Sequence, residues 1–121
     1  MKQRRDSLEP NELAHAIVDA AADKKASDVV LLDLRRVTLI ADYFVVCNGQ
    51  STRQLRGIAD GIAESLKEMG ERPLHVEGEP ESGWILMDFG AVIAHIFSPE
   101  LRTHYALEKL WQDAPVVVRM Q

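Results

Sequence analysis

Residues 83–97 read GWILMDFGAVIAHIF, and this stretch decides the fold. It predicts two consecutive strands joined by a tight turn at residues 89–90, because glycine adopts backbone conformations that a side chain would penalise. Alternation along the first strand places Trp84, Leu86 and Asp88 on one face. The opposite face is also apolar, which is typical of a strand buried on both sides or of one that meets a partner. Because a carboxylate shares the Trp84 face, we interpret that face as a recognition surface.

The length and composition are those of a small globular protein. The 121 residues are 46% apolar and 27% charged, enough for one domain that buries its own core. Cys47 is the only cysteine, so neither a disulfide framework nor a four-cysteine metal site is available. No apolar run reaches the roughly 20 residues that span a bilayer. We expect a flexible tail over residues 1–9, which has no secretory or transit pattern, and a single cytoplasmic domain over residues 10–121.

The net charge of −5 is concentrated in one segment. Residues 71–100 contain six acidic residues and one arginine, so this segment carries the whole excess. An acidic surface repels phosphate, which disfavours direct nucleic-acid binding there. It suits a basic protein surface, where complementary charge speeds encounter and fixes orientation. A solubilising loop is the alternative interpretation of such a cluster.

The order of predicted elements is helix, two strands, helix, three strands, helix. This order indicates an α/β (α+β) fold with a mixed five-stranded sheet and flanking helices. Pro10 opens the first helix, and Ser51 or Thr52 caps the most strongly periodic one, which Gly70 ends. The last helix starts at Ser98-Pro99 and continues to about Gln112, and residues 115–119 are a possible further extended piece.

Enzymatic sites are weakly indicated. Gly49-x-Ser51 between a strand and a helix is compatible with phosphate binding, but no Asp-x-Asp pair follows it, so we interpret Ser51 as a cap. Cys47 lies within an apolar strand and is expected to be an inert, buried thiol. We expect His95 to be hydrogen-bonded and half-buried. No metal-binding spacing connects the candidate ligands, which are His75, His95, Asp33, Asp42 and Asp88, and no nucleophile-elbow pattern supports a triad of Ser51, His95 and Asp88.

Trp84 and Tyr105 give a different signal. Large amphipathic aromatics near acidic residues and an arginine, here Arg102, are the residue types that dominate protein–protein hot spots. The same rings are also common in hydrophobic cores. Chemistry alone leaves both interpretations open.

Three stretches together resemble one family. They are CNGQSTR at 47–53, WILMDFG at 84–90 with His95 downstream, and RTHYALEKLW at 102–111. In this order and spacing they resemble the ribosomal silencing factor family (RsfS, also called Iojap) over about residues 9–112. The tryptophan-containing segments are specific to the family, whereas the Gly-x-Ser segment alone is not.

The resemblance implies a fold similar to nucleotidyltransferases without their catalytic carboxylates, and hence a non-enzyme without cofactor or metal. It implies docking on the large ribosomal subunit through ribosomal protein L-fourteen, where the bound protein blocks joining of the small subunit and lowers translation when nutrients are scarce. Neither a membrane nor a specific nucleic-acid sequence is expected as a partner. The family's contact surface falls on Trp84, Ile85, Leu86, Asp88, Arg102 and Tyr105.

Two other functions stay open at this point. One is a small nucleotidyltransferase-like, nucleotide-binding enzyme that uses Ser51 and nearby acids. The other is a homodimer in which the hairpin at residues 84–97 pairs with itself, and this state is compatible with ribosome binding through the same surface.

Overall fold

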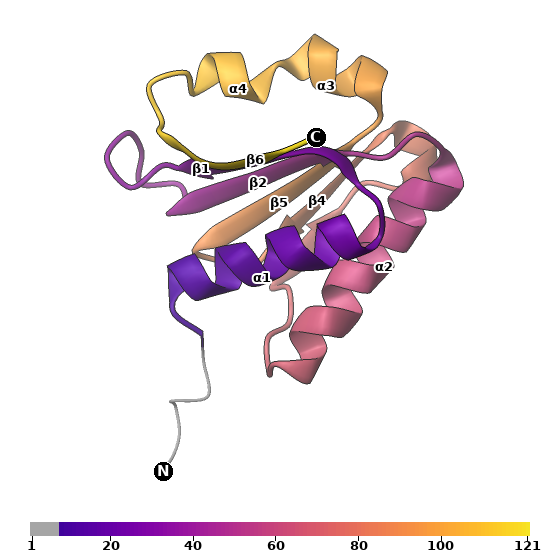
Figure 1. Ribbon diagram of the computed structural model, residues 1–121, viewed down its shortest axis with the longest axis horizontal. Helices are drawn as coiled ribbons and strands as arrows, with labels where there is room; N and C mark the ends of the chain where they lie inside the picture. The colour runs from indigo at the N-terminus through magenta and orange to yellow at the C-terminus, as the bar shows by residue number, and fades with distance from the viewer. Residues whose placement is uncertain (1–7) are drawn as a thin grey trace.

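A six-stranded sheet forms the middle layer of the structure, a computed structural model that describes residues 8–121 (Figure 1). Helices α1 (Pro10–Asp23) and α2 (Thr52–Glu68) pack against one face of the sheet. The shorter helices α3 (Pro99–Tyr105) and α4 (Leu107–Leu110) lie over the other face. The strands are β1 (Ser27–Asp33), β2 (Tyr43–Asn48), β3 (His75–Glu77), β4 (Trp84–Asp88), β5 (Val92–Phe97) and β6 (Val116–Met120).

The sheet is mixed, as predicted, and its strand order is β3-β4-β5-β2-β1-β6. Only β2 and β5 run parallel, and the crossover between them includes α2. The remaining neighbours are antiparallel. The chain therefore places β4 and β5, the hairpin of residues 84–97, between the short edge strand β3 and the buried strand β2.

The prediction of five strands was wrong, because residues 116–120 add a sixth strand at the outer edge of β1. The Asp33 amide donates to the Pro115 carbonyl at the start of this pairing, so β6 satisfies backbone groups that β1 would otherwise leave open. The side chains of β6 stay mostly exposed. Alternating polar and apolar residues, the usual sequence signal of a half-buried strand, are therefore missing.

The helix starts follow the capping residues in the sequence. Glu9 and Glu12 form a reciprocal capping box at the start of α1, with Pro10 in the first turn. The Ser51 hydroxyl accepts from the Gln54 amide at 3.1 Å, which confirms its role as the cap of α2. Among residues 8–121, no helix is both long enough and apolar enough to cross a membrane.

The last helix differs from its prediction. Instead of running unbroken to about Gln112, it is divided at Ala106, whose φ of 47° is left-handed. This change of direction lets Leu107 and Trp111 pack against the apolar residues of the sheet face below them. No glycine or proline marks the break, so tertiary packing overrides the local helical signal here.

The expected tail over residues 1–9 is described only at its end. Residues 1–7 lie outside the described part of the chain. Leu8 packs against the core, and its amide donates to the Glu71 carboxylate at 2.9 Å. Leu8 therefore already contacts the domain, two residues before the predicted boundary.

Gly78 tests the backbone geometry near the hairpin, and Gly57 is its matched control. Gly78 has a φ of +86°, and a Cβ there would lie 2.1 Å from the Trp84 carbonyl oxygen. We expect Gly78→Ala to lower the free energy of unfolding by about 2–4 kcal/mol, from left-handed strain plus the clash. Gly57, inside α2, has no atom within 4 Å of an added Cβ. Gly57→Ala should raise the free energy of unfolding by about 0.5–1 kcal/mol.

Urea unfolding of both variants measures these differences. A Gly78→Ala protein as stable as the wild type would contradict the geometry described for the start of β4.

Candidate docking surface

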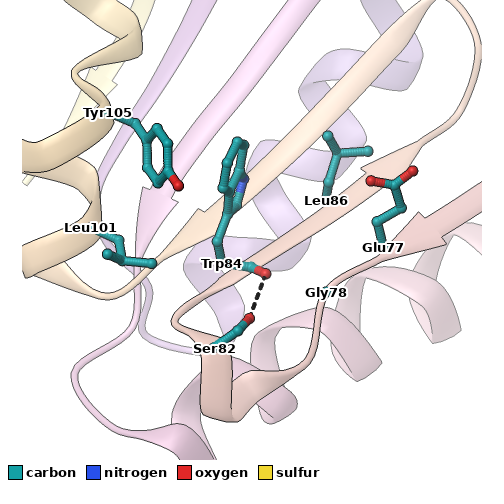
Figure 2. Close-up of a pocket in the computed structure, with 7 residues that line it drawn as sticks. All are labelled: Glu77, Gly78, Ser82, Trp84, Leu86, Leu101 and Tyr105. Atoms are coloured by element: carbon teal, nitrogen blue, oxygen red, sulfur yellow. Dashed lines mark hydrogen bonds between the residues drawn. The ribbon is translucent and has the colours of Figure 1, made fainter.

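A hollow of about 240 Å³ lies between α3 and the outer strands of the sheet (Figure 2). We call it the aromatic hollow. Trp84 stands in it between Tyr105 of α3 and Leu86 of β4. The other lining residues are Glu77, Gly78, Ser82 and Leu101. The hollow is thus apolar in its centre, with a carboxylate at its edge.

Strand alternation positions the hollow's side chains. Along β4, Trp84, Leu86 and Asp88 are half-buried, whereas Ile85 and Met87 face α1 and α2 and are buried. This is the predicted division of the two faces. Leu86 lies opposite Glu77 of β3 in the antiparallel register, so apolar and acidic side chains are neighbours on this face.

The Trp84 indole is part of an aromatic stack. Its ring centroid lies 5.0 Å from that of Phe97 and 4.6 Å from that of Tyr105. Phe97 is buried, Trp84 is half-buried, and Tyr105 is 46% exposed. The stack therefore leads from the core to the solvent, and Trp84 both packs on the core and is partly exposed.

His95 lies below this stack and contacts the indole directly. The Trp84 Nε1–H donates to His95 Nδ1 at 3.2 Å, and His95 is only 4% exposed, less than the half-burial predicted. Burial lowers the pKa of His95 to about 4, so the imidazole is neutral at physiological pH and can accept this bond. Sequence reasoning missed the partnership, although Trp84 and His95 lie on adjacent strands and share a face.

The acidic residues near the hollow have distinct roles. Asp88 is half-buried, and its Oδ1 accepts from the Gly90 amide at 2.7 Å, which fixes the β4–β5 turn. Glu77 is exposed and lies 2.7 Å from His75 Nε2. Glu79 and Glu81 are exposed next to it, around the short 3-10 helix η2 (Pro80–Ser82). Glu77 is therefore the carboxylate that lines the hollow.

Two predicted contact residues do not reach the surface. Ile85 is 3% exposed and packs in the core on the α1–α2 side of the sheet. Arg102 is 6% exposed. The expectation that these side chains present themselves to a partner is therefore corrected: Ile85 is placed inward by strand alternation, and Arg102 by an ion-pair network.

Arg102 connects three parts of the chain that are distant in sequence. Its guanidinium donates to the Asp28 carbonyl, to Asn48 Oδ1 at 2.9 Å, and to Glu108 Oε2 from both Nε and Nη2. Asp28 has a φ of 48°, a left-handed conformation in which its carbonyl accepts this bond. The network ties α3 and α4 to the ends of β1 and β2. Arg102 thus holds the helix that carries Tyr105.

The other chemical candidates do not converge on a site. Cys47 is buried, and desolvation raises its pKa to about 12, which confirms an inert thiol. Within residues 8–121, no group of three or more His, Cys, Asp or Glu side chains is arranged to hold a metal ion. The Ser51 hydroxyl serves as the cap of α2.

Comparison with known proteins gives a consistent family. The family model described as ribosomal silencing factor during starvation matches residues 7–121. A ribosomal silencing factor RsfS of Halalkalibacterium halodurans is 42% identical over 106 residues, which cover 88% of this chain and 91% of that protein. The chloroplastic protein Iojap of Zea mays is 30% identical, over 90% of this chain and 47% of that one.

The fold is also shared with solved structures. A crystal structure of a Chromobacterium violaceum protein, 31% identical, superposes with a TM-score of 0.83 over 87% of this chain and 88% of that one. A crystal structure of a Bacillus halodurans protein, 37% identical, superposes with a TM-score of 0.78 over 89% of this chain and 98% of that one.

The depressed pKa of His95 predicts a specific pH dependence. Between about pH 6.5 and pH 4 the unfolded chain binds a proton at His95 that the folded chain does not, so the free energy of unfolding falls as the pH is lowered. The full loss is about 3 kcal/mol. His95→Asn has nothing to titrate there, and the side chains around the ring, Phe44, Val46, Trp84, Leu86 and Phe97, do not titrate in this range.

Urea unfolding of the wild type and His95→Asn at pH 7 and pH 4 checks this. Carboxylates titrate in both proteins and lower the free energy of unfolding of each. The wild type should lose more than the variant, because only the wild type has His95 to protonate. Equal losses in the two proteins would show that His95 is not a buried neutral imidazole.

Proposed function

We propose, because this chain belongs to the ribosomal silencing factor family, that it represses translation by occupying the large ribosomal subunit and keeping the small subunit from joining. The aromatic hollow is the observation that carries the proposal. It supplies an apolar centre with an acidic edge, which is the anatomy of a protein-docking surface. Most of its residues come from β4 and α3, which pack on the core, and the others come from β3 and the segment between β3 and β4.

The partner on the ribosome is ribosomal protein L-fourteen in this proposal. A Mus musculus relative is named mitochondrial assembly of ribosomal large subunit protein 1, which connects that protein with the large subunit. It is 31% identical, over 78% of this chain and 43% of its own length. Trp84, Leu86, Asp88 and Tyr105 form the contact, with Glu77 at its edge. Ile85 supports β4 from the core, and Arg102 supports α3.

Charge complementarity supports a basic protein surface as the partner. Six of the chain's acids and only one arginine fall in residues 71–100, and Glu77, Glu79 and Glu81 are exposed beside the hollow. Such a surface attracts lysine- and arginine-rich protein and repels bare phosphate. Docking through it makes direct, sequence-specific RNA recognition unnecessary.

The mechanism is steric occlusion in the cytoplasm and needs no catalytic step. A bound protein that covers a face required by the small subunit competes for that face by mass action. The extent of repression then follows the occupancy of the large subunit. Control of translation therefore depends on the amount of the protein and on its affinity for the large subunit.

A nucleotide-binding enzyme remains the contrasting function. Its site would lie in a second hollow of about 290 Å³ at the start of α2, lined by Gly49, Ser51 and Thr52. Ser51 is committed to capping, and Glu81 adds a negative charge to the same hollow. Calorimetry with a nucleoside triphosphate and Mg²⁺ separates the two, since tight binding favours the enzyme. A free homodimer through the aromatic hollow is detected by sedimentation at several protein concentrations.

Tyr105→Ala tests the contact directly. Because the ring is partly exposed at the hollow, its removal leaves no enclosed cavity, and the fold should survive. We expect binding to purified large subunits, measured by co-sedimentation, to weaken about thirtyfold, the effect of a hot-spot residue worth about 2 kcal/mol. Leu39→Ala is the control, since Leu39 is fully exposed in the β1–β2 loop and does not line the hollow. Unchanged binding of Tyr105→Ala would exclude the hollow as the docking site.

Charge reversal at the edge tests the electrostatic part. Glu77→Lys should weaken docking about fivefold at low salt and reduce its dependence on salt concentration, because an attractive pair becomes repulsive. Glu64→Lys changes the net charge equally but lies on α2, on the other side of the sheet. Identical salt dependence of the two variants would contradict a specific role for the acidic edge.

A further inference from the structure

The Trp84 indole is held by one hydrogen bond as well as by stacking. Its Nε1–H donates to His95 Nδ1 at 3.2 Å, from a strand that pairs directly with β4. We propose that His95 is a positioning residue for docking: its Nδ1 fixes the indole of Trp84 in the orientation that the partner meets. This inference rests on the proposed function, because it names how the same surface is kept ready.

The hydrogen bond assigns the imidazole tautomer. Since Nδ1 accepts from the indole, the proton of the neutral ring is on Nε2. Within the described part of the chain, Nε2 is buried and has no hydrogen-bond partner. A buried donor without an acceptor costs stability. This cost offsets the gain from the Trp84 bond, so stability alone does not account for a histidine at position 95.

The surroundings of the ring support the same conclusion. His95 packs edge-on against Phe44 with 4.6 Å between centroids, and nearly parallel to Phe97 at 6.1 Å. Both neighbours are apolar, so neither needs a polar side chain at position 95. The feature that only a hydrogen-bond acceptor provides is the contact with Trp84.

Fixing the indole matters because its two long edges differ. One carries the Nε1–H, and the other is wholly apolar. With Nε1–H turned to His95, the polar edge is satisfied inside the protein while the ring stays stacked on Phe97 and Tyr105. Without the acceptor, the indole loses the bond that selects this orientation, and docking must first order the ring.

His95→Leu and His95→Asn separate positioning from packing. Leucine removes the acceptor, whereas the asparagine Oδ1 can take the place of Nδ1. We expect His95→Leu to bind large subunits about tenfold more weakly while its resistance to urea is kept or increased. His95→Asn should bind within about threefold of the wild type. These factors correspond to the loss or retention of one net hydrogen bond.

A spectrum of the free protein reads the contact without the ribosome. A Trp111→Phe variant identifies which of the two indole signals in a ¹H–¹⁵N correlation spectrum belongs to Trp84. In His95→Leu the Trp84 Nε1–H signal should move upfield, and its proton should exchange faster with solvent. In His95→Asn it should stay close to its wild-type position. Ile96→Val is the control for lost stability, because Ile96 is buried on the opposite face of β5. It should change neither the indole signal nor docking.

The outcomes are distinct. A folded His95→Leu protein with an unchanged indole signal, or with wild-type docking, overturns the positioning role. If His95→Leu does not fold, His95→Phe is measured in the same way and decides the question. If the wild type itself does not bind large subunits, the proposed function fails, whereas the indole signal still tests the positioning by His95.

Discussion

The sheet face that carries α3 and α4 is wider than these two helices. Six strands at about 4.8 Å spacing span roughly 24 Å, and a helix covers only about 10 Å. The two helices on this face, α3 and α4, have seven and four residues. They pack over apolar residues of β1, β2 and β5 and leave much of β4 and β3 open. The aromatic hollow is the boundary between the covered and the open part of the sheet.

This boundary is maintained by polar contacts below the surface. Arg102 ties α3 to β1, β2 and α4, so the backbone that carries Tyr105 is fixed. His95 contacts the indole of Trp84 from β5. Both residues are almost fully buried, and both serve side chains that are at least partly exposed. The aromatic hollow is therefore ordered in the protein alone, and such order lowers the entropic cost of any association through it.

The sequence was informative where local rules operate. Capping at Ser51, the alternation of β4, the buried Cys47 and the hairpin turn at Gly90 each depend on neighbours within a few residues, and all four are found in the structure. The family itself was predicted from three spaced segments, because these combine aromatic, acidic and glycine residues in an order that chance rarely gives.

Long-range contacts account for what the sequence did not predict. Strand β6 exists because β1 has an open edge, the break at Ala106 follows from packing on the sheet, and neither has a local signal. Arg102 was predicted at the surface because an arginine near aromatics fits an interface. Its partners Asp28 and Asn48 lie 74 and 54 residues away, and only the fold brings them together.

The central claim is that one small protein prevents subunit joining by occupying a surface. Light scattering of purified large and small subunits, with increasing amounts of this protein added first to the large subunit, measures it directly. The account predicts that joining falls in proportion to the fraction of large subunits occupied and approaches zero at saturation. Normal joining of large subunits that are saturated with the protein would contradict it.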